Sequence, residues 1–238
     1  MSGKIIRYDC YDLRKFKIGQ INNFIDIGAN KGTTSLMAKI LMPDARIIAF
    51  EPCKETYSNY LVNNVSMWGI ECHNTALGDG TSLCFVPGRH SGVHRFCVDN
   101  IKEKKWWPPN YKYTIESKTI NNLFKNHNIS INSSYILKID CEGGERFLLQ
   151  KEQKKDSLNI IRNSVQTMIE IHFGFGGNTE QWNSYFNEIK NTHDIKIGVW
   201  KDKKTPDRRY EYVPCNSLPN KGFKQFELIN KKWFQKNM

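Results

Sequence analysis

The sequence predicts an α/β fold in which a mostly parallel sheet carries helices on both faces. One observation is an apolar run that ends in a glycine turn, Gly28 to Gly32, and continues as a helical pattern. Another is that two further apolar runs end on acids, Glu51 and Asp140. Strands that alternate with helices build a parallel sheet, and ligands bind at the carboxyl ends of its strands. These strand ends therefore predict a ligand site.

The composition fits a single domain over residues 1–238. Lys and Arg outnumber Asp and Glu by 35 to 24, and the formal charge of +11 favours acidic partners such as phosphates, nucleotide sugars or nucleic acid. No apolar run reaches the ~20 residues that cross a bilayer, and the N-terminus lacks a signal-peptide pattern, so we expect an intracellular, cytoplasmic protein. The seven cysteines include no CxxC pair, so we expect reduced thiols.

The first quarter of the chain predicts an arm followed by two strand–helix units. Residues 1–21 form the expected N-terminal arm. A strand at 23–28 is followed by a helix that Pro43 stops. A strand at 46–51 is followed by a helix that Pro52 starts.

The spacing from the glycine turn to Glu51 indicates a nucleoside cofactor. An acid about 20 residues after the glycines, at the end of the second strand, accepts hydrogen bonds from ribose hydroxyls. The glycines follow GxxxG rather than GxGxxG, and there is no GxxxxGK[ST], which favours S-adenosylmethionine over NAD or ATP. The alternative is that the glycines only let helix pack on strand. The expected cofactor-binding residues are Asp26, Gly28, Ala29, Asn30, Gly32, Glu51, Pro52, Ala76, Leu77 and Asp140.

A third strand is expected at 70–77, and residues 81–113 then interrupt the alternation as a hairpin-like insertion. Its loop at 104–113 is basic and aromatic. Such a loop can stack a sugar or base, although paired Trp residues more often anchor an insertion to the body of a protein. A zinc site in the insertion is disfavoured because no usual zinc spacing fits its ligand candidates, Cys84, His90, His94 and Cys97.

The second informative stretch is a buried strand from Tyr135 to Asp140. Its period of two puts Lys138 and Asp140 on the same face, and a Gly-Gly turn then starts a helix that carries Glu145. Burying several ionisable groups costs several kcal/mol unless they pair or bind a ligand. The group at this strand end is therefore predicted to be functional.

The C-terminal third predicts further strands of the same sheet. A strand at 165–172 places Glu170 and His172 beside the preceding strand end, and a helix through 182–189 follows. A strand near 194–200 comes next. Residues 201–222 are expected to be a basic loop, either solvated or a phosphate-binding rim, before a last strand at 223–229.

An ordered set of motifs resembles the FkbM-type methyltransferase family. The motifs are DIGANKG at 26–32, AFEP at 49–52, NTALGD at 74–79, SKTINNL at 117–123, LKIDCEGGE at 137–145 and IEIHFGF at 169–175. The resemblance implies a Rossmann-like class I methyltransferase sheet with an antiparallel last strand, S-adenosylmethionine as cofactor, and O-methylation of a sugar or related hydroxyl. The chain departs from the family at Asn121, where an acid is common.

Methyl transfer to an alcohol requires an aligned acceptor and a group that takes its proton. Asp140 is the first candidate for the group at the methyl and His172 for the base, with Lys138, Glu142 and Glu170 as further catalytic candidates. Glu145, like Glu142 and Glu170, is expected to be an orienting group or a metal ligand. His172 could instead be a core histidine bonded to Glu170 or to backbone. These residues could alternatively bind a divalent cation, Mg²⁺ or Mn²⁺, with Asp140, Glu142, Glu170 and His172 as ligands.

Three functions follow from these features. The leading prediction is an O-methyltransferase that acts on a hydroxyl of a sugar, glycan or nucleotide-sugar, with an acceptor that carries an acidic or phosphate-bearing portion. The alternatives are an RNA ribose 2′-O-methyltransferase, which the net charge favours, and a non-catalytic cofactor-binding module.

Overall fold

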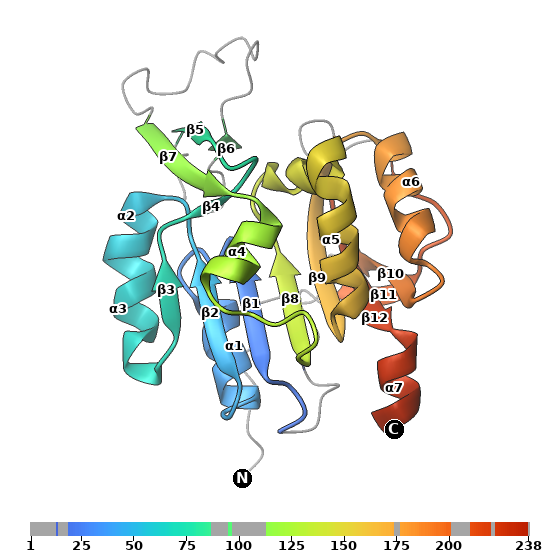
Figure 1. Ribbon diagram of the computed structural model, residues 1–238, viewed down its shortest axis with the longest axis horizontal. Helices are drawn as coiled ribbons and strands as arrows, with labels where there is room; N and C mark the ends of the chain where they lie inside the picture. The colour runs from blue at the N-terminus through green and yellow to red at the C-terminus, as the bar shows by residue number, and fades with distance from the viewer. Residues whose placement is uncertain are drawn as a thin grey trace.

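The fold is built around an eight-stranded sheet in the order β11-β10-β12-β9-β8-β1-β2-β3 (Figure 1). The computed structural model describes residues 13, 19–86, 95–96, 113–173, 177–200, 210–219 and 222–237. In sheet order the strands are β11 (Tyr210–Pro214), β10 (His193–Trp200), β12 (Gly222–Asn230), β9 (Gln166–Phe173), β8 (Tyr135–Ile139), β1 (Asn23–Ile27), β2 (Arg46–Phe50) and β3 (Glu71–His73).

The direction of the strands agrees with the expected methyltransferase-type sheet. The pairs β1–β2, β2–β3, β1–β8 and β8–β9 are parallel. The last strand, β12, is antiparallel to both of its neighbours, β9 and β10. The prediction of a mostly parallel sheet with an antiparallel last strand is therefore confirmed.

Helices cover both faces of this sheet, and alternate residues of each strand supply two separate cores. Ile25 of β1 packs with α4, α5 and α6, which cover the face turned toward the viewer in Figure 1. Its neighbour Phe24 packs in the other core, which holds α1, α3 and the aromatic residues of α7. The helices are α1 (Thr33–Leu41), α2 (Lys54–Thr56), α3 (Val62–Val65), α4 (Ile120–Asn126), α5 (Lys151–Asn163), α6 (Thr179–Ile189) and α7 (Lys231–Asn237), with π-helical or 3₁₀ segments η2 (Tyr57–Leu61), η3 (Ser66–Trp68) and η4 (Gly144–Leu149).

The predicted third strand is divided between two sheets. Residues 71–73 join the main sheet as β3, whereas β4 (Ala76–Leu77) pairs with β7 (Tyr113–Lys118) in a second sheet. β5 (Ser82–Val86) pairs antiparallel with β7 and with β6 (Arg95–Phe96), in agreement with the expected inserted hairpin.

Two expectations need correction. Residues 210–214 of the predicted basic loop form β11, because they pair along the edge strand β10. The expectation of reduced thiols is wrong at Cys84, which is disulfide-bonded, while Cys53, Cys72, Cys141 and Cys215 are free.

Several expected features lie outside the described residues. They are the N-terminal arm apart from Leu13 and residues 19–21, the aromatic loop before Tyr113, the residues His90, His94 and Cys97, and the basic run at 201–209. Within the part of the chain that the structure describes, no helix combines the length and apolar character needed to cross a membrane.

Candidate active site

The strand order of the main sheet reverses between β1 and β8, so the ends of these strands form the edge where ligands bind in open α/β sheets. Ile27 and Ile139 are in register, and the Asp140 N–H donates to the Ile27 carbonyl oxygen at 3.0 Å. The turn at Gly28 follows directly. Gly28 has φ of +83°, and a Cβ atom on it would lie 1.7 Å from the Asp140 carbonyl oxygen. Only glycine lets these two strand ends approach so closely.

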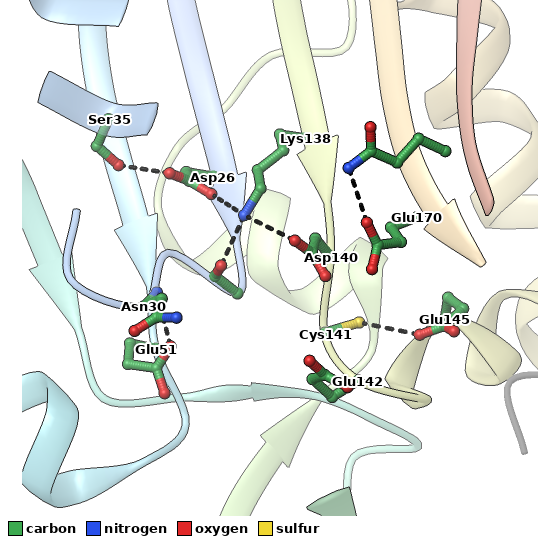
Figure 2. Close-up of polar contacts among 12 residues, drawn as sticks. Asp26, Asn30, Ser35, Glu51, Lys138, Asp140, Cys141, Glu142, Glu145 and Glu170 are labelled. Atoms are coloured by element: carbon green, nitrogen blue, oxygen red, sulfur yellow. Dashed lines mark hydrogen bonds and ion pairs between the residues drawn. The ribbon is translucent and has the colours of Figure 1, made fainter. Parts of the chain in front are cut away.

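A buried ionic network holds the glycine turn against β8 (Figure 2). The Lys138 ammonium lies 3.0 Å from Asp26 Oδ1 and donates to the Gly28 carbonyl oxygen at 2.6 Å. The Ser35 hydroxyl of α1 donates to Asp26 Oδ2 at 2.6 Å. Asp26 is fully buried, so its carboxylate organises the turn from behind rather than facing a ligand.

Glu51, at the end of β2, lies where a ribose-binding acid is expected. Its oxygens accept backbone N–H groups from Asn30 and Cys53, each at 2.8 Å. The Asn74 side chain donates to the Glu51 carbonyl oxygen at 2.8 Å and to the Pro52 carbonyl oxygen at 3.1 Å. Glu51 therefore holds the backbone on both sides of the end of β2 in place, with its carboxylate at the carboxyl end of that strand.

The remaining cofactor candidates divide into turn residues and buried residues. Ala29 follows Gly28, and both N–H groups donate to the Phe50 carbonyl oxygen at 2.9 Å. Gly32 is required by packing, because its Cβ would lie 2.5 Å from the Val65 side chain. Ala76 and Leu77 are buried in β4. Gly28 and Asn30 of the turn are partly exposed, whereas Ala29 and Glu51 are as buried as the β4 residues.

The other half of the site is a group of carboxylates around His172, at the carboxyl ends of β8 and β9. His172 Nδ1 lies 2.9 Å from Glu145 Oε1, and His172 Nε2 lies 3.2 Å from Glu142 Oε2 and 3.4 Å from Glu170 Oε1. Asp140 Oδ2 lies 3.9 Å from the Lys138 ammonium. Figure 2 shows these carboxylates grouped around the end of β8.

The surroundings of these groups shift their protonation. Burial lowers the pKa of His172, but hydrogen bonds to Glu142 and Glu145 outweigh it and raise that pKa to about 11. Burial, together with the nearby charge of Asp140, raises the pKa of Glu170 to about 7. Burial also raises the pKa of Asp140 against the opposing charges of Lys138 and His172. His172 therefore carries a proton at neutral pH, which argues against its expected role as the base.

The structure brings the predicted catalytic residues together. Lys138 and Asp140 share a face as the strand period predicts, and Asp140, Glu142 and His172 each offer a ligand atom within 4.8 Å of the others. Sequence reasoning missed Gln225, which donates from β12 to Glu170 Oε2 at 2.8 Å. It also missed Asn74, although this residue begins the NTALGD motif.

Both halves of the site flank β1 at one edge of a mostly parallel sheet, with antiparallel β12 inserted between β9 and β10. This arrangement defines the class I methyltransferase fold. Residues 26–194 match the methyltransferase FkbM domain, and the chain belongs to that family.

The individual proteins that the chain resembles share little sequence identity with it. "Methyltransferase 1" of Beauveria bassiana is 26% identical over 158 residues, which are 59% of this chain and 61% of that protein. The chain thus spans less than two thirds of that relative. The solved FkbM methyltransferase of Methylobacillus flagellatus KT is 14% identical, with a TM-score of 0.46 over 90% of this chain and 45% of that one. The precorrin-6y C5,15-methyltransferase of Geobacter metallireducens GS-15 is 9% identical, with a TM-score of 0.44 over 91% and 83% of the two chains.

Proposed function

We propose that the chain is an S-adenosylmethionine-dependent O-methyltransferase that acts on a hydroxyl of a sugar, glycan or nucleotide-sugar. Family membership implies the cofactor. The observation that carries the proposal is the position of two groups on either side of β1. Glu51, a ribose-type acceptor, lies at the end of β2, and the carboxylates led by Asp140 lie at the end of β8.

The residues of the first half fit the proposed cofactor. Glu51 is 4% exposed and already orders the backbone of Asn30, so its carboxylate would meet a ribose without rearranging. Asn30 has φ of +52°, which turns the backbone sharply after Ala29. When bound, S-adenosylmethionine supplies a methyl group on a positively charged sulfur. The carboxylates at the end of β8 complement that charge.

The second half is suited to holding a hydroxylated acceptor. The side chains of Asp140 and Glu142 are 28% and 26% exposed, so their oxygens can accept hydrogen bonds from acceptor hydroxyls. Glu170 is the base that we propose in place of His172, because Gln225 holds one oxygen and leaves the other directed toward the cluster. A positioned base typically contributes ~10²- to 10⁴-fold to the rate.

The charge of this half restricts the acceptor further. A phosphate close to the methyl would meet Asp140, Glu142 and Glu170, and the repulsion would oppose binding. We therefore propose that any acidic portion of the acceptor binds away from the reacting hydroxyl, where the net charge of +11 attracts it.

Calorimetric titration with S-adenosylmethionine tests the cofactor half. Glu51→Ala removes two acceptor oxygens and is expected to weaken binding ~10- to 100-fold, on the order of 1.5–3 kcal/mol for hydrogen bonds to a charged group. Glu71→Ala is the matched control, since Glu71 is a strand carboxylate that pairs with Arg46 at 2.6 Å instead. Absence of binding to the parent protein at millimolar ligand would refute the proposal.

Labelled cofactor offered with nucleotide sugars, oligosaccharides or capped RNA tests the acceptor half. We expect label in the carbohydrate arms. Label in RNA alone would establish the ribose 2′-O-methyltransferase alternative. Cofactor binding without transfer to any acceptor class would favour the non-catalytic module.

A further inference from the structure

Glu145 is a buried acid in a position that the proposed reaction does not use. It lies in η4, its side chain is fully buried, and it is not open to an acceptor as Asp140 and Glu142 are. Burying a carboxylate costs several kcal/mol unless hydrogen bonds or opposite charges replace its water. The contacts of this carboxylate therefore identify what it does.

Each oxygen of Glu145 binds a different part of the active site. Oε1 accepts the backbone N–H of His172 at 2.7 Å and lies 2.9 Å from His172 Nδ1. Oε2 accepts the backbone N–H of Gly143 at 2.8 Å. One carboxylate thus joins the turn after β8 to the end of β9.

The turn that Glu145 holds is the one that presents Glu142. Glu142 has φ of +50° and Gly143 has φ of +98°, so two successive residues lie in the left-handed region. A non-glycine residue there is strained, and it stays there only when its surroundings hold it. The hydrogen bond from Gly143 to Glu145 is such a restraint, one residue away from Glu142.

We propose that Glu145 is a positioning residue that fixes the acceptor half of the site. Through Nδ1 it sets the His172 ring so that Nε2 faces Glu142 and Glu170, and through Gly143 it holds the turn that carries Glu142. This inference deepens the proposed function and rests on it. A second-sphere carboxylate that orients a histidine through its other ring nitrogen is a general device of active sites.

The amide of glutamine cannot replace this carboxylate. All the contacts to Glu145 described above come from N–H groups or from the His172 ring, so both oxygens must accept. Glu145→Gln keeps the shape but turns one oxygen into an NH₂ group. That group would face either Gly143 N–H or His172 N–H and break one of the two links.

Steady-state kinetics of Glu145→Gln give the main test. We expect kcat to fall by about 10²-fold, since a displacement of ~1 Å in an active site has that cost. The KM for S-adenosylmethionine should change less than about threefold, because Glu145 acts on the acceptor half. Glu227→Gln is the matched control. Glu227 is also buried, on β12, and accepts from Gln166 Nε2 at 2.6 Å, remote from His172.

Equal losses of kcat in both variants, or a kcat for Glu145→Gln within about threefold of the parent, would overturn the inference. A second measurement needs neither a folded variant nor an active enzyme. In the parent protein the amide protons of Gly143 and His172 should exchange as slowly as those of the β9 interior. Fast exchange of either amide would show that the carboxylate does not link the two segments. A parent that binds cofactor but methylates nothing would refute the proposed function and leave the exchange result to decide the inference.

Discussion

At the scale of single residues, the exposed fraction of each charged side chain around β1 and β8 indicates whether it holds the protein together or can contact a ligand. Asp26 and Glu145 are fully buried and Lys138 is 4% exposed, and each is occupied by contacts within the protein. Asp140 and Glu142 are about a quarter exposed. Asp26, Glu145 and Lys138 therefore position backbone and ring atoms, whereas Asp140 and Glu142 are exposed enough to contact a ligand.

The position of His172 predicts that no divalent metal is required. Its Nε2 lies within 3.4 Å of both Glu142 and Glu170, so the imidazolium already provides positive charge to two carboxylates that a cation would bind. We expect methyl transfer to survive treatment with EDTA, and calorimetric titration of the treated protein with Mg²⁺ or Mn²⁺ to show no binding below the millimolar range.

Activity lost with EDTA and restored by either metal would contradict this prediction. It would identify Asp140, Glu142 and His172 as ligands. Glu142→Gln would then be expected to weaken metal binding, which provides the control for the titration.

His193 predicts a specific loss of stability in acid. It is 1% exposed, its Nε2 lies 3.3 Å from the Ser164 carbonyl oxygen, and burial lowers its pKa to about 4. The usual pKa near 6.5 applies to the unfolded chain, so the unfolded state binds more protons between these values. The contribution of neutral His193 to the free energy of unfolding is therefore fully present above pH ~6.5. It is lost as the pH drops toward ~4, by up to roughly 3 kcal/mol at 1.36 kcal/mol per pKa unit.

Urea unfolding from pH 7 to pH 4.5 measures this effect as a difference between the parent and His193→Gln. Glutamine can still donate to the Ser164 carbonyl oxygen but does not titrate, so the variant should lose less stability on acidification. Parallel pH profiles for the two proteins would show that His193 does not contribute.

At the scale of elements, the ends of β1 and β8 approach each other so closely that the contact has no room for a side chain at Gly28. Gly28→Ala would place a Cβ atom 1.7 Å from the Asp140 carbonyl oxygen in a residue with φ of +83°. Overlap and a positive φ each cost roughly 1–3 kcal/mol, so we expect a loss of about 2–6 kcal/mol in the free energy of unfolding.

Gly19→Ala separates the two causes in the same denaturation measurement. Gly19 has φ of +84°, but no atom of the described residues would lie within 4 Å of a Cβ atom added there. It should therefore show only the backbone cost of ~1–2 kcal/mol. Equal losses in both variants would mean that the strand ends can separate to admit a methyl group.

The local sequence pattern predicted most of the alternating strands and helices. Glycine, proline and the period of apolar side chains act over only a few residues, so the sequence itself reveals them. This logic located β1, α1, β2, β8 and β9 and put Lys138 and Asp140 on one face. It could not assign partners that come from distant segments. Asp26 was expected to contact the cofactor, yet its partners are Ser35 and Lys138. Gln225 was missed because it meets Glu170 across strands that lie 55 residues apart.

The predicted boundary of the basic loop was wrong for a related reason. A short polar strand such as β11 is specified by the edge it pairs with, here β10, rather than by its own composition. The split of residues 70–77 between two sheets also depends on β7, which lies some 40 residues further along the chain. Pairing of this kind is set by the tertiary structure.

At the scale of the whole molecule, the two halves of the site lie on opposite sides of β1. The proposed cofactor half is made by β1, β2 and the turns that follow them, within residues 23–74, and Lys138 of β8 holds its glycine turn. The acceptor half requires β8, β9 and β12, from residue 135 to residue 230. We therefore expect substitutions of Glu51 to act mainly on cofactor affinity and substitutions of Glu170 to act mainly on turnover.

The place of β12 has a consequence for how the protein is made. This strand follows β9 and β10 in the chain, yet it is inserted between them and carries the amide that holds Glu170. While it is absent, β9 and β10 present unpaired edges, which invite aggregation. The group of side chains around His172 is therefore complete only after translation has passed residue 225, because Gln225 supplies the hydrogen bond to Glu170.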